Sequence, residues 1–154
     1  MLYKRRNRPA RGVLGSASIP TVVFTTVCTK GRKRWLANPE LHSALRAAWL
    51  RHVHWVVSWY LIMPDHVHFF AEPGEKPLPF DDWVAVWKSG VARILKNPEC
   101  RWQAASFHHR IRSYEDYNER RIYMDENPVR AGLVERIEDW PHRGELFQRF
   151  HWWS

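Results

Sequence analysis

The feature that most constrains the fold is a long apolar stretch, residues 55–73, which only Pro64 and Asp65 interrupt. Both halves are rich in β-branched and aromatic residues, and two such runs around a short turn are typical of a β-hairpin. The sequence therefore predicts two antiparallel strands, Trp55 to Pro64 and His66 to Pro73. The remaining segments have to be arranged around this hairpin.

Strand and helix patterns alternate on either side of the hairpin. Residues 20–28 are dense in Val and Thr with a period near two, which is typical of a half-buried strand. A helix is predicted to begin after Asn38, because this capping residue precedes a proline at the first helical position. Residues 80–96 repeat apolar side chains at the spacing of an amphipathic helix. A fourth strand is predicted within residues 101–112.

A third helix is predicted to begin after Ser113, a capping residue followed by acidic residues in the first turn. Pro128 predicts that this helix ends near Asn127, because the residue before a proline disfavours helical geometry. A short further helix and a basic aromatic tail are expected after it. We divide the chain into a basic, flexible N-terminal arm (1–18), one domain (19–140) and the tail (141–154).

The predicted order β-α-β-β-α-β, followed by helices, is that of a ferredoxin-like split βαβ domain. This is an α+β fold in which helices back one face of an antiparallel sheet, and a C-terminal helix then follows the sheet. The length of 154 residues suits one domain. The second face of the sheet needs a cover or a ligand.

The charge of the chain favours a polyanionic partner, with nucleic acid first. Lys and Arg number 24 against 16 acidic residues, which gives a formal charge of +8. Cys28 and Cys100 belong to no CxxC pattern, so neither a disulfide framework nor a zinc ribbon is indicated, and a reducing cytoplasm is expected. No apolar run approaches the roughly 18 residues that a membrane-spanning helix needs, so we expect a soluble protein without a membrane partner.

The tripeptide His-Val-His occurs twice, at residues 52–54 and 66–68. On a strand, residues two apart point to the same side, so His66 and His68 are able to present two imidazoles to one metal ion. His52 and His54 lie where a helix is predicted to end, and residues two apart diverge around a helix. Two histidines packed among aromatic side chains are the alternative explanation for the second tripeptide.

A metal site at the second tripeptide needs a further ligand from elsewhere in the chain. The third predicted helix offers one, because Tyr123 and Asn127 are four residues apart and lie on one helix face. This pair places a potential nucleophile beside a potential ligand. Tyr114 and Tyr117 are competing nucleophiles by residue type, but Tyr117 lies on a largely different face from Tyr123.

Three strings together carry a family resemblance: MPDHVHFF (63–70), YMDENPVRAGLV (123–134) and EDWP (138–141). The first resembles the HUH motif, in which U is a bulky apolar residue. The other two resemble the C-terminal signature of single-tyrosine HUH transposases, and more closely that of the REP-associated tyrosine transposases. The likeness runs from the first predicted strand to Trp140.

The resemblance implies roles for four residues. His66 and His68 are the expected metal ligands, Asn127 the third protein ligand and Tyr123 the catalytic nucleophile. The implied cofactor is Mg²⁺ or Mn²⁺, although two imidazoles also suit Zn²⁺ or Ni²⁺. Asp65 stands where similar proteins frequently have Asn or Glu.

The implied activity is cleavage and rejoining of single-stranded DNA at palindromic hairpins through a 5′-phosphotyrosine intermediate. A bacterial, cytoplasmic protein is expected, with a monomer favoured over a dimer. Three alternatives stay open: a domesticated relative that binds hairpins with little turnover, a metal-dependent nuclease in which water attacks, and a plain nucleic-acid-binding module.

Basic residues in two regions are predicted to contact DNA. Arg110, Arg112 and Arg130 flank the predicted site in sequence and are candidates for phosphate contacts, with surface solubility as the alternative. The basic arm that includes Lys4, Arg5 and Arg6 is either a solvated tail or, as the family resemblance implies, a recognition element for the bases beside a hairpin.

Overall fold

The structure, a computed structural model, describes residues 21–147. It contains five strands, three α-helices and two short 3-10 helices. In chain order these are β1 (Val23–Cys28), η2 (Lys30–Arg32), α1 (Pro39–Arg51), β2 (Trp55–Ile62), β3 (His66–Pro73), α2 (Phe80–Leu95), β4 (Phe107–Arg110), α3 (Tyr114–Arg130), η3 (Ile137–Asp139) and β5 (Arg143–Glu145).

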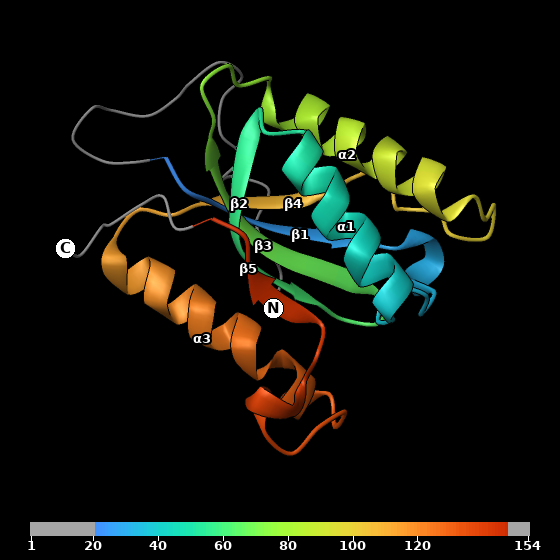
Figure 1. The fold of residues 1–154 in the computed structure, drawn as a ribbon. Helices are drawn as coiled ribbons and strands as arrows, with labels where there is room; N and C mark the ends of the chain where they lie inside the picture. Colours follow the sequence, from blue (N-terminus) through green and yellow to red (C-terminus); the bar gives the residue numbers. More distant parts are fainter. Residues whose placement is uncertain (1–20, 148–154) are drawn as a thin grey trace.

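The strands form one antiparallel sheet in the order β4-β1-β3-β2-β5. The predicted hairpin is β2 and β3, and the first four strands have the predicted ferredoxin-like order. Helices α1 and α2 lie together on one face of the sheet, and α3 lies on the other face (Figure 1). The predicted α+β fold is therefore confirmed, and α3 is the cover that the second face required.

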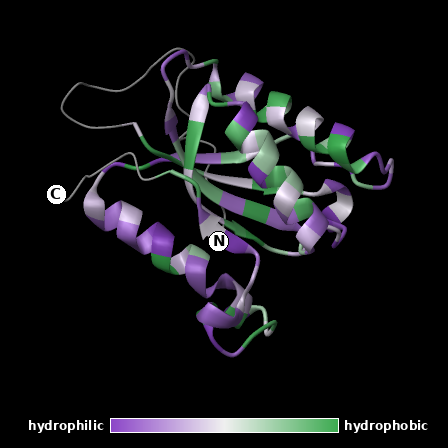
Figure 2. Ribbon diagram, viewed as in Figure 1, coloured by the Kyte–Doolittle hydropathy of each residue, from purple (hydrophilic) through white to green (hydrophobic). Residues whose placement is uncertain are grey.

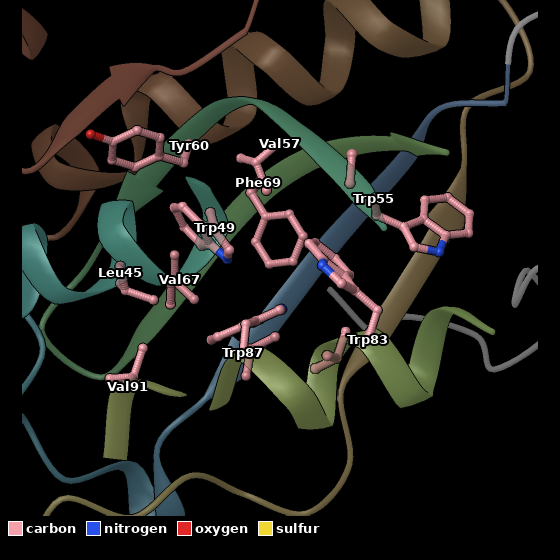
Figure 3. Close-up of a cluster of buried hydrophobic side chains, with 14 of the residues drawn as sticks. Leu45, Trp49, Trp55, Val57, Tyr60, Val67, Phe69, Trp83, Trp87 and Val91 are labelled. Carbon is pink, nitrogen blue, oxygen red and sulfur yellow. The ribbon is translucent and has the colours of Figure 1, made fainter. Parts of the chain in front are cut away.

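The core between the sheet and helices α1 and α2 is centred on large aromatic side chains. Phe69 projects from β3 and contacts Trp49, Trp83 and Trp87 at ring-centroid distances of 5.3, 5.8 and 5.9 Å (Figure 3). All four side chains are fully buried. The indole Nε1 of Trp83 donates to the carbonyl of His52 at 2.7 Å, which ties α2 to the end of α1.

We expect Trp83→Ala to destabilise the domain by about 3–5 kcal/mol, because it leaves a large cavity in this core and removes a buried hydrogen bond. The measurement is the free energy of unfolding in urea. Leu50→Ala on α1 is the control: Leu50 is 50% exposed, and we expect a change of at most about 0.5 kcal/mol. Similar losses in both variants would contradict the assignment of Trp83 to the core.

The second face of the sheet packs against α3 through fewer apolar contacts. Phe70 on β3 lies 4.7 Å from the ring of Tyr117, and Met124 is buried nearby in the same cluster. Most of α3 is hydrophilic (Figure 2). A polar contact adds to the attachment: Trp59 on β2 donates to Asp125 at 3.1 Å, and the guanidinium of Arg121 lies 3.7 Å over the Trp59 ring.

The prediction that Pro128 ends the third helix is wrong. The helix continues to Arg130, because a proline removes only its own backbone donor, and the amide of Ala131 still bonds the carbonyl of Asn127 at 2.9 Å. Ala131 is the C-cap, and Gly132 after it has a φ of +73°, the left-handed conformation typical of a residue that follows a C-cap.

Other boundaries also differ from the sequence analysis. The fourth strand is shorter than predicted, and the short helix expected after Pro128 is the 3-10 helix η3. Strand β5 was not predicted: it pairs with β2, so the sheet extends past residue 140 into the segment that we had placed in the tail. The predicted arm (1–18) and residues 148–154 lie outside the described residues. Within residues 21–147, no helix is both long and apolar enough to span a membrane.

Candidate active site

His66 and His68 project from β3 toward α3, on the face opposite Val67 and Phe69. Val67 and Phe69 belong to the core cluster on the α1 and α2 side of the sheet, whereas Phe70 belongs to the cluster on the α3 side. Since side chains alternate along a strand, His66 and His68 lie on the same face as Phe70. The Nε2 atoms of the two imidazoles lie 3.1 Å apart. The strand geometry that the sequence predicted for this tripeptide is therefore present.

Helix α3 brings Tyr123 and Asn127 to the same point. The Nδ2 atom of Asn127 lies 3.2 Å from Nε2 of His66 and 3.0 Å from Nε2 of His68. The Tyr123 ring lies 6.3 Å from the His68 ring, in an edge-on arrangement. The four predicted site residues thus form one cluster between β3 and the C-terminal half of α3.

Each histidine is held by a hydrogen bond to its other ring nitrogen. Nδ1 of His66 lies 2.7 Å from Asp65 Oδ1, and Nδ1 of His68 lies 2.8 Å from the Thr26 hydroxyl. When Nδ1 carries the proton, Nδ1–H donates outward and the lone pair of Nε2 points into the cluster. Partners of this kind fix the ring orientation and tautomer of metal-binding histidines.

Burial favours the neutral form of both imidazoles. His68 is only 3% exposed, and burial holds its pKa well below the usual value for histidine. Burial also lowers the pKa of His66, although the carboxylate of Asp65 opposes this effect. Neutral imidazoles are the form that binds a metal ion.

The donor spacing fits an octahedral cation. The three distances among His66 Nε2, His68 Nε2 and the Asn127 amide are 3.0–3.2 Å. Neighbouring ligands about 2.1 Å from an octahedral ion are about 3.0 Å apart, so these atoms match three adjacent corners of an octahedron. A half-turn of the Asn127 amide exchanges its nitrogen for its oxygen, which is a suitable ligand.

Asn127 supplies the third donor group of this cluster. Within residues 21–147, no group of three or more His, Cys, Asp and Glu side chains is placed to hold a metal ion. A metal centre at His66 and His68 would therefore take its third protein donor from the Asn127 amide.

Two supporting residues escaped the sequence analysis, Thr26 and Arg32. The Arg32 guanidinium donates to Asp65 Oδ2 at 2.9 Å and to the Cys28 thiol at 3.0 Å. Arg32 has a φ of +54°, an uncommon conformation for a residue other than glycine. No local pattern signals either residue, because their partners lie 42 and 33 positions away in the sequence.

The predicted DNA-binding arginines lie in two places. The Arg130 guanidinium lies 4.3 Å over the Tyr123 ring and donates to the Tyr123 carbonyl at 2.6 Å, so it belongs to the cluster. Arg110 ends β4 and Arg112 precedes α3, so both lie at the opposite end of this helix from Asn127. Lys4, Arg5 and Arg6 lie outside the described residues.

The first His-Val-His tripeptide lies in the connection between α1 and β2. His52 is the C-cap residue of α1, and its ring is stacked parallel to that of His54 with centroids 6.3 Å apart. The pair lies beyond the opposite end of the hairpin from His66, since Gly74, after β3, bonds the carbonyl of His54. The two tripeptides are therefore separate in space.

Two curated proteins that are similar to this chain share one family name. No family model matches the chain. A REP-associated tyrosine transposase from Escherichia coli K12 is 28% identical over 136 residues, which cover 83% of this chain and 75% of the relative. A Haemophilus influenzae protein named for the same family is 28% identical over 135 residues, covering 77% and 76%. The chain is a homologue of the REP-associated tyrosine transposases.

The fold supports this relationship. A solved REP-associated tyrosine transposase, bound to a REP hairpin, superimposes with a TM-score of 0.73 at 22% identity. The match covers 92% of this chain and 82% of that protein. This match shows a shared fold, and the two curated relatives confirm the family resemblance inferred from the sequence motifs.

Proposed function

We propose that the protein is a metal-dependent transposase that cleaves and rejoins single-stranded DNA at palindromic hairpins through a 5′-phosphotyrosine intermediate. The observation that carries this proposal is the convergence of two imidazoles, one buried and one half-buried, with one amide and one tyrosine at a single point. The names of the curated relatives support it, as does the REP hairpin bound to the solved relative.

In the proposed reaction, the Tyr123 oxygen attacks the scissile phosphorus in line with the departing 3′ oxygen. A bond forms between the phenolic oxygen and phosphorus, and the bond from phosphorus to the 3′ oxygen breaks. The departing 3′ oxygen gains one proton for the one that the phenol loses. The products are a 5′-phosphotyrosine and a free 3′-OH. Because the number of phosphodiester bonds is unchanged, the 3′-OH of another strand is able to reverse the step without ATP.

His66, His68 and Asn127 would hold Mg²⁺ or Mn²⁺. When bound, the cation neutralises charge on the non-bridging phosphate oxygens and orients the phosphoryl group. Asp65 and Thr26 keep the imidazole rings aligned, and Arg130 holds the ring of Tyr123 from its other side.

The DNA is proposed to reach the cluster over a basic surface. Arg130 supplies a cation beside the nucleophile, and Arg110 and Arg112 contact phosphates at the far end of α3. We propose a monomer, because the proposed reaction needs no residue from a second copy of the chain. We place the activity in the bacterial cytoplasm, because the curated relatives are bacterial and both cysteines are free thiols.

The test of this proposal is adduct formation with single-stranded hairpin oligonucleotides that carry a label at either end, incubated with Mn²⁺ or with EDTA. A labelled band that runs with the protein on a denaturing gel, only with Mn²⁺, is expected. The end whose label is retained gives the polarity of the linkage. Cleavage without an adduct would instead favour hydrolysis by water, and binding without cleavage would favour a hairpin-binding relative.

We expect Asp65→Asn to weaken Mn²⁺ binding by about 10- to 100-fold, because the neutral amide is a poorer acceptor for the Nδ1–H of His66. Isothermal titration calorimetry measures the affinity. Asp82→Asn, at an exposed position in the first turn of α2, is the matched control and is expected to bind Mn²⁺ as the wild type does. Equal affinities for all three proteins would show that Asp65 does not support a metal ligand.

A further inference from the structure

A hollow lies on the α2 side of the sheet, away from the Tyr123 cluster. It has a volume of about 830 Å³ and lies between α2 and the segment 100–106 that leads into β4. Volumes of this size are typical of sites for small organic groups. The mechanism proposed above uses none of its lining residues.

Small side chains create the hollow. Ala85, Ser89 and Ala92 recur at helical spacing along α2, and Ala104 and Ala105 lie in the facing wall. Because none of these short side chains reaches across, a hollow remains beside the point where Lys88 of α2 donates to the Gln103 carbonyl of the facing segment at 2.9 Å. Trp102 adds an aromatic ring to the lining. The small apolar side chains and the indole suit an aromatic ring.

The charged lining residues give the hollow a positive character. Lys30, Lys88 and Arg101 line it, whereas Asp81 is the one carboxylate that does so. Asp81 is engaged with His108, whose Nε2 lies 2.7 Å from its Oδ1. Three cations beside an apolar hollow provide for both parts of a nucleotide, because the base needs an apolar surface and the phosphate needs a positive charge.

The hollow is joined to the candidate active site by the end of β1. Thr29 pairs with Trp102 on one side of this strand, and Cys28 pairs with His66 on the other. The backbones of Trp102 and His66 are therefore separated by two strand spacings, or about 10 Å. Lys30 lines the hollow, and Arg32, two residues later in the same turn, bonds Asp65 beside His66.

We propose that this hollow binds an unpaired nucleotide of the same DNA strand that Tyr123 cleaves. The base enters the hollow between α2 and the segment 100–106, and the adjoining phosphates lie against Lys30, Lys88 and Arg101. The strand then passes over the turn at residues 30–32 to reach the cluster. This inference rests on the proposed function, because it concerns the substrate of that reaction.

The experiment compares two substitutions by tryptophan at exposed helix positions. Ala85→Trp fills the hollow without changing charge, and Ala47→Trp on α1 is the matched control. The probes are a DNA stem-loop without flanks and a pool of the same stem-loops with short, randomised single-stranded flanks. Fluorescence anisotropy gives the affinities. Flanks that contain 5-iodouracil are cross-linked by light, and mass spectrometry identifies the attached peptides.

The expected result is that Ala85→Trp binds the flanked pool at least about fivefold more weakly than the wild type but binds the flankless stem-loop equally well. Ala47→Trp behaves as the wild type, and cross-links map to α2 and residues 100–106. If Ala85→Trp matches Ala47→Trp, or the cross-links map only elsewhere, the inference fails and the proposed function stands. If the wild type binds neither probe, the proposed function fails and the inference fails with it.

Discussion

Tyr123→Phe is expected to abolish the covalent adduct with DNA and to lower strand cleavage by at least about a thousandfold, because the reaction loses its nucleophile. The change is conservative in structure. Phenylalanine keeps the ring that lies under the Arg130 guanidinium and beside His68, and it removes only the hydroxyl. DNA affinity, measured by anisotropy with EDTA present, is expected to stay within about twofold of wild type.

The matched controls are the two other tyrosines of α3. Tyr117 is 8% exposed and packs against Phe70, and Tyr114 is 46% exposed at the first turn of the helix. Tyr117→Phe and Tyr114→Phe are each expected to form the adduct. An adduct that persists in Tyr123→Phe and disappears in one of these two variants would move the nucleophile to the other end of α3.

His66→Ala and His68→Ala are each expected to reduce cleavage by more than about a hundredfold and to remove measurable Mn²⁺ binding, because two protein donors cannot replace three. The double variant His52→Ala with His54→Ala is the matched control, since it removes the same tripeptide from the other end of the hairpin. The contact between Trp83 and residue 52 uses the backbone carbonyl of that residue, so it survives the substitution. This double variant is expected to cleave as the wild type does.

Two readouts separate a metal role from a folding role. Circular dichroism and thermal unfolding establish whether His68→Ala, which alters a buried position, is folded. Calorimetry with Mn²⁺ then tests binding without DNA. Full activity of His66→Ala, or loss of activity in the double variant at residues 52 and 54, would contradict the proposed metal centre.

The parts of the fold that follow from local patterns were predictable from the sequence. The apolar hairpin and the alternation along β3 predicted that His66 and His68 share a face, and helical spacing did the same for Tyr123 and Asn127. Neither pattern says that β3 and α3 meet. That proximity depends on long-range packing, and the family resemblance supplied it before the structure did.

Strand β5 shows why other parts were not predictable. Arg143, Gly144 and Glu145 have none of the β-branched or aromatic residues that mark a strand. They pair with the free edge of β2, where a side chain at position 144 would approach the Tyr60 hydroxyl to 2.7 Å, so only glycine fits without a shift. This strand is specified by its partner. The same holds for Thr26 and Arg32, whose roles appear only when β1 is placed beside β3.

Strand β1 and the turn after it contribute no residue to the proposed chemistry, yet they support both histidines. Thr26 reaches one ring directly, and Arg32 reaches the other through Asp65. If the proposed metal centre is correct, two homologues with the same proposed ligands and the same tyrosine would be able to differ in metal affinity through these two positions alone. An intact catalytic motif in a genome sequence is thus an insufficient guide to whether such a transposon-related protein is still active, and positions 26 and 32 should be compared with it.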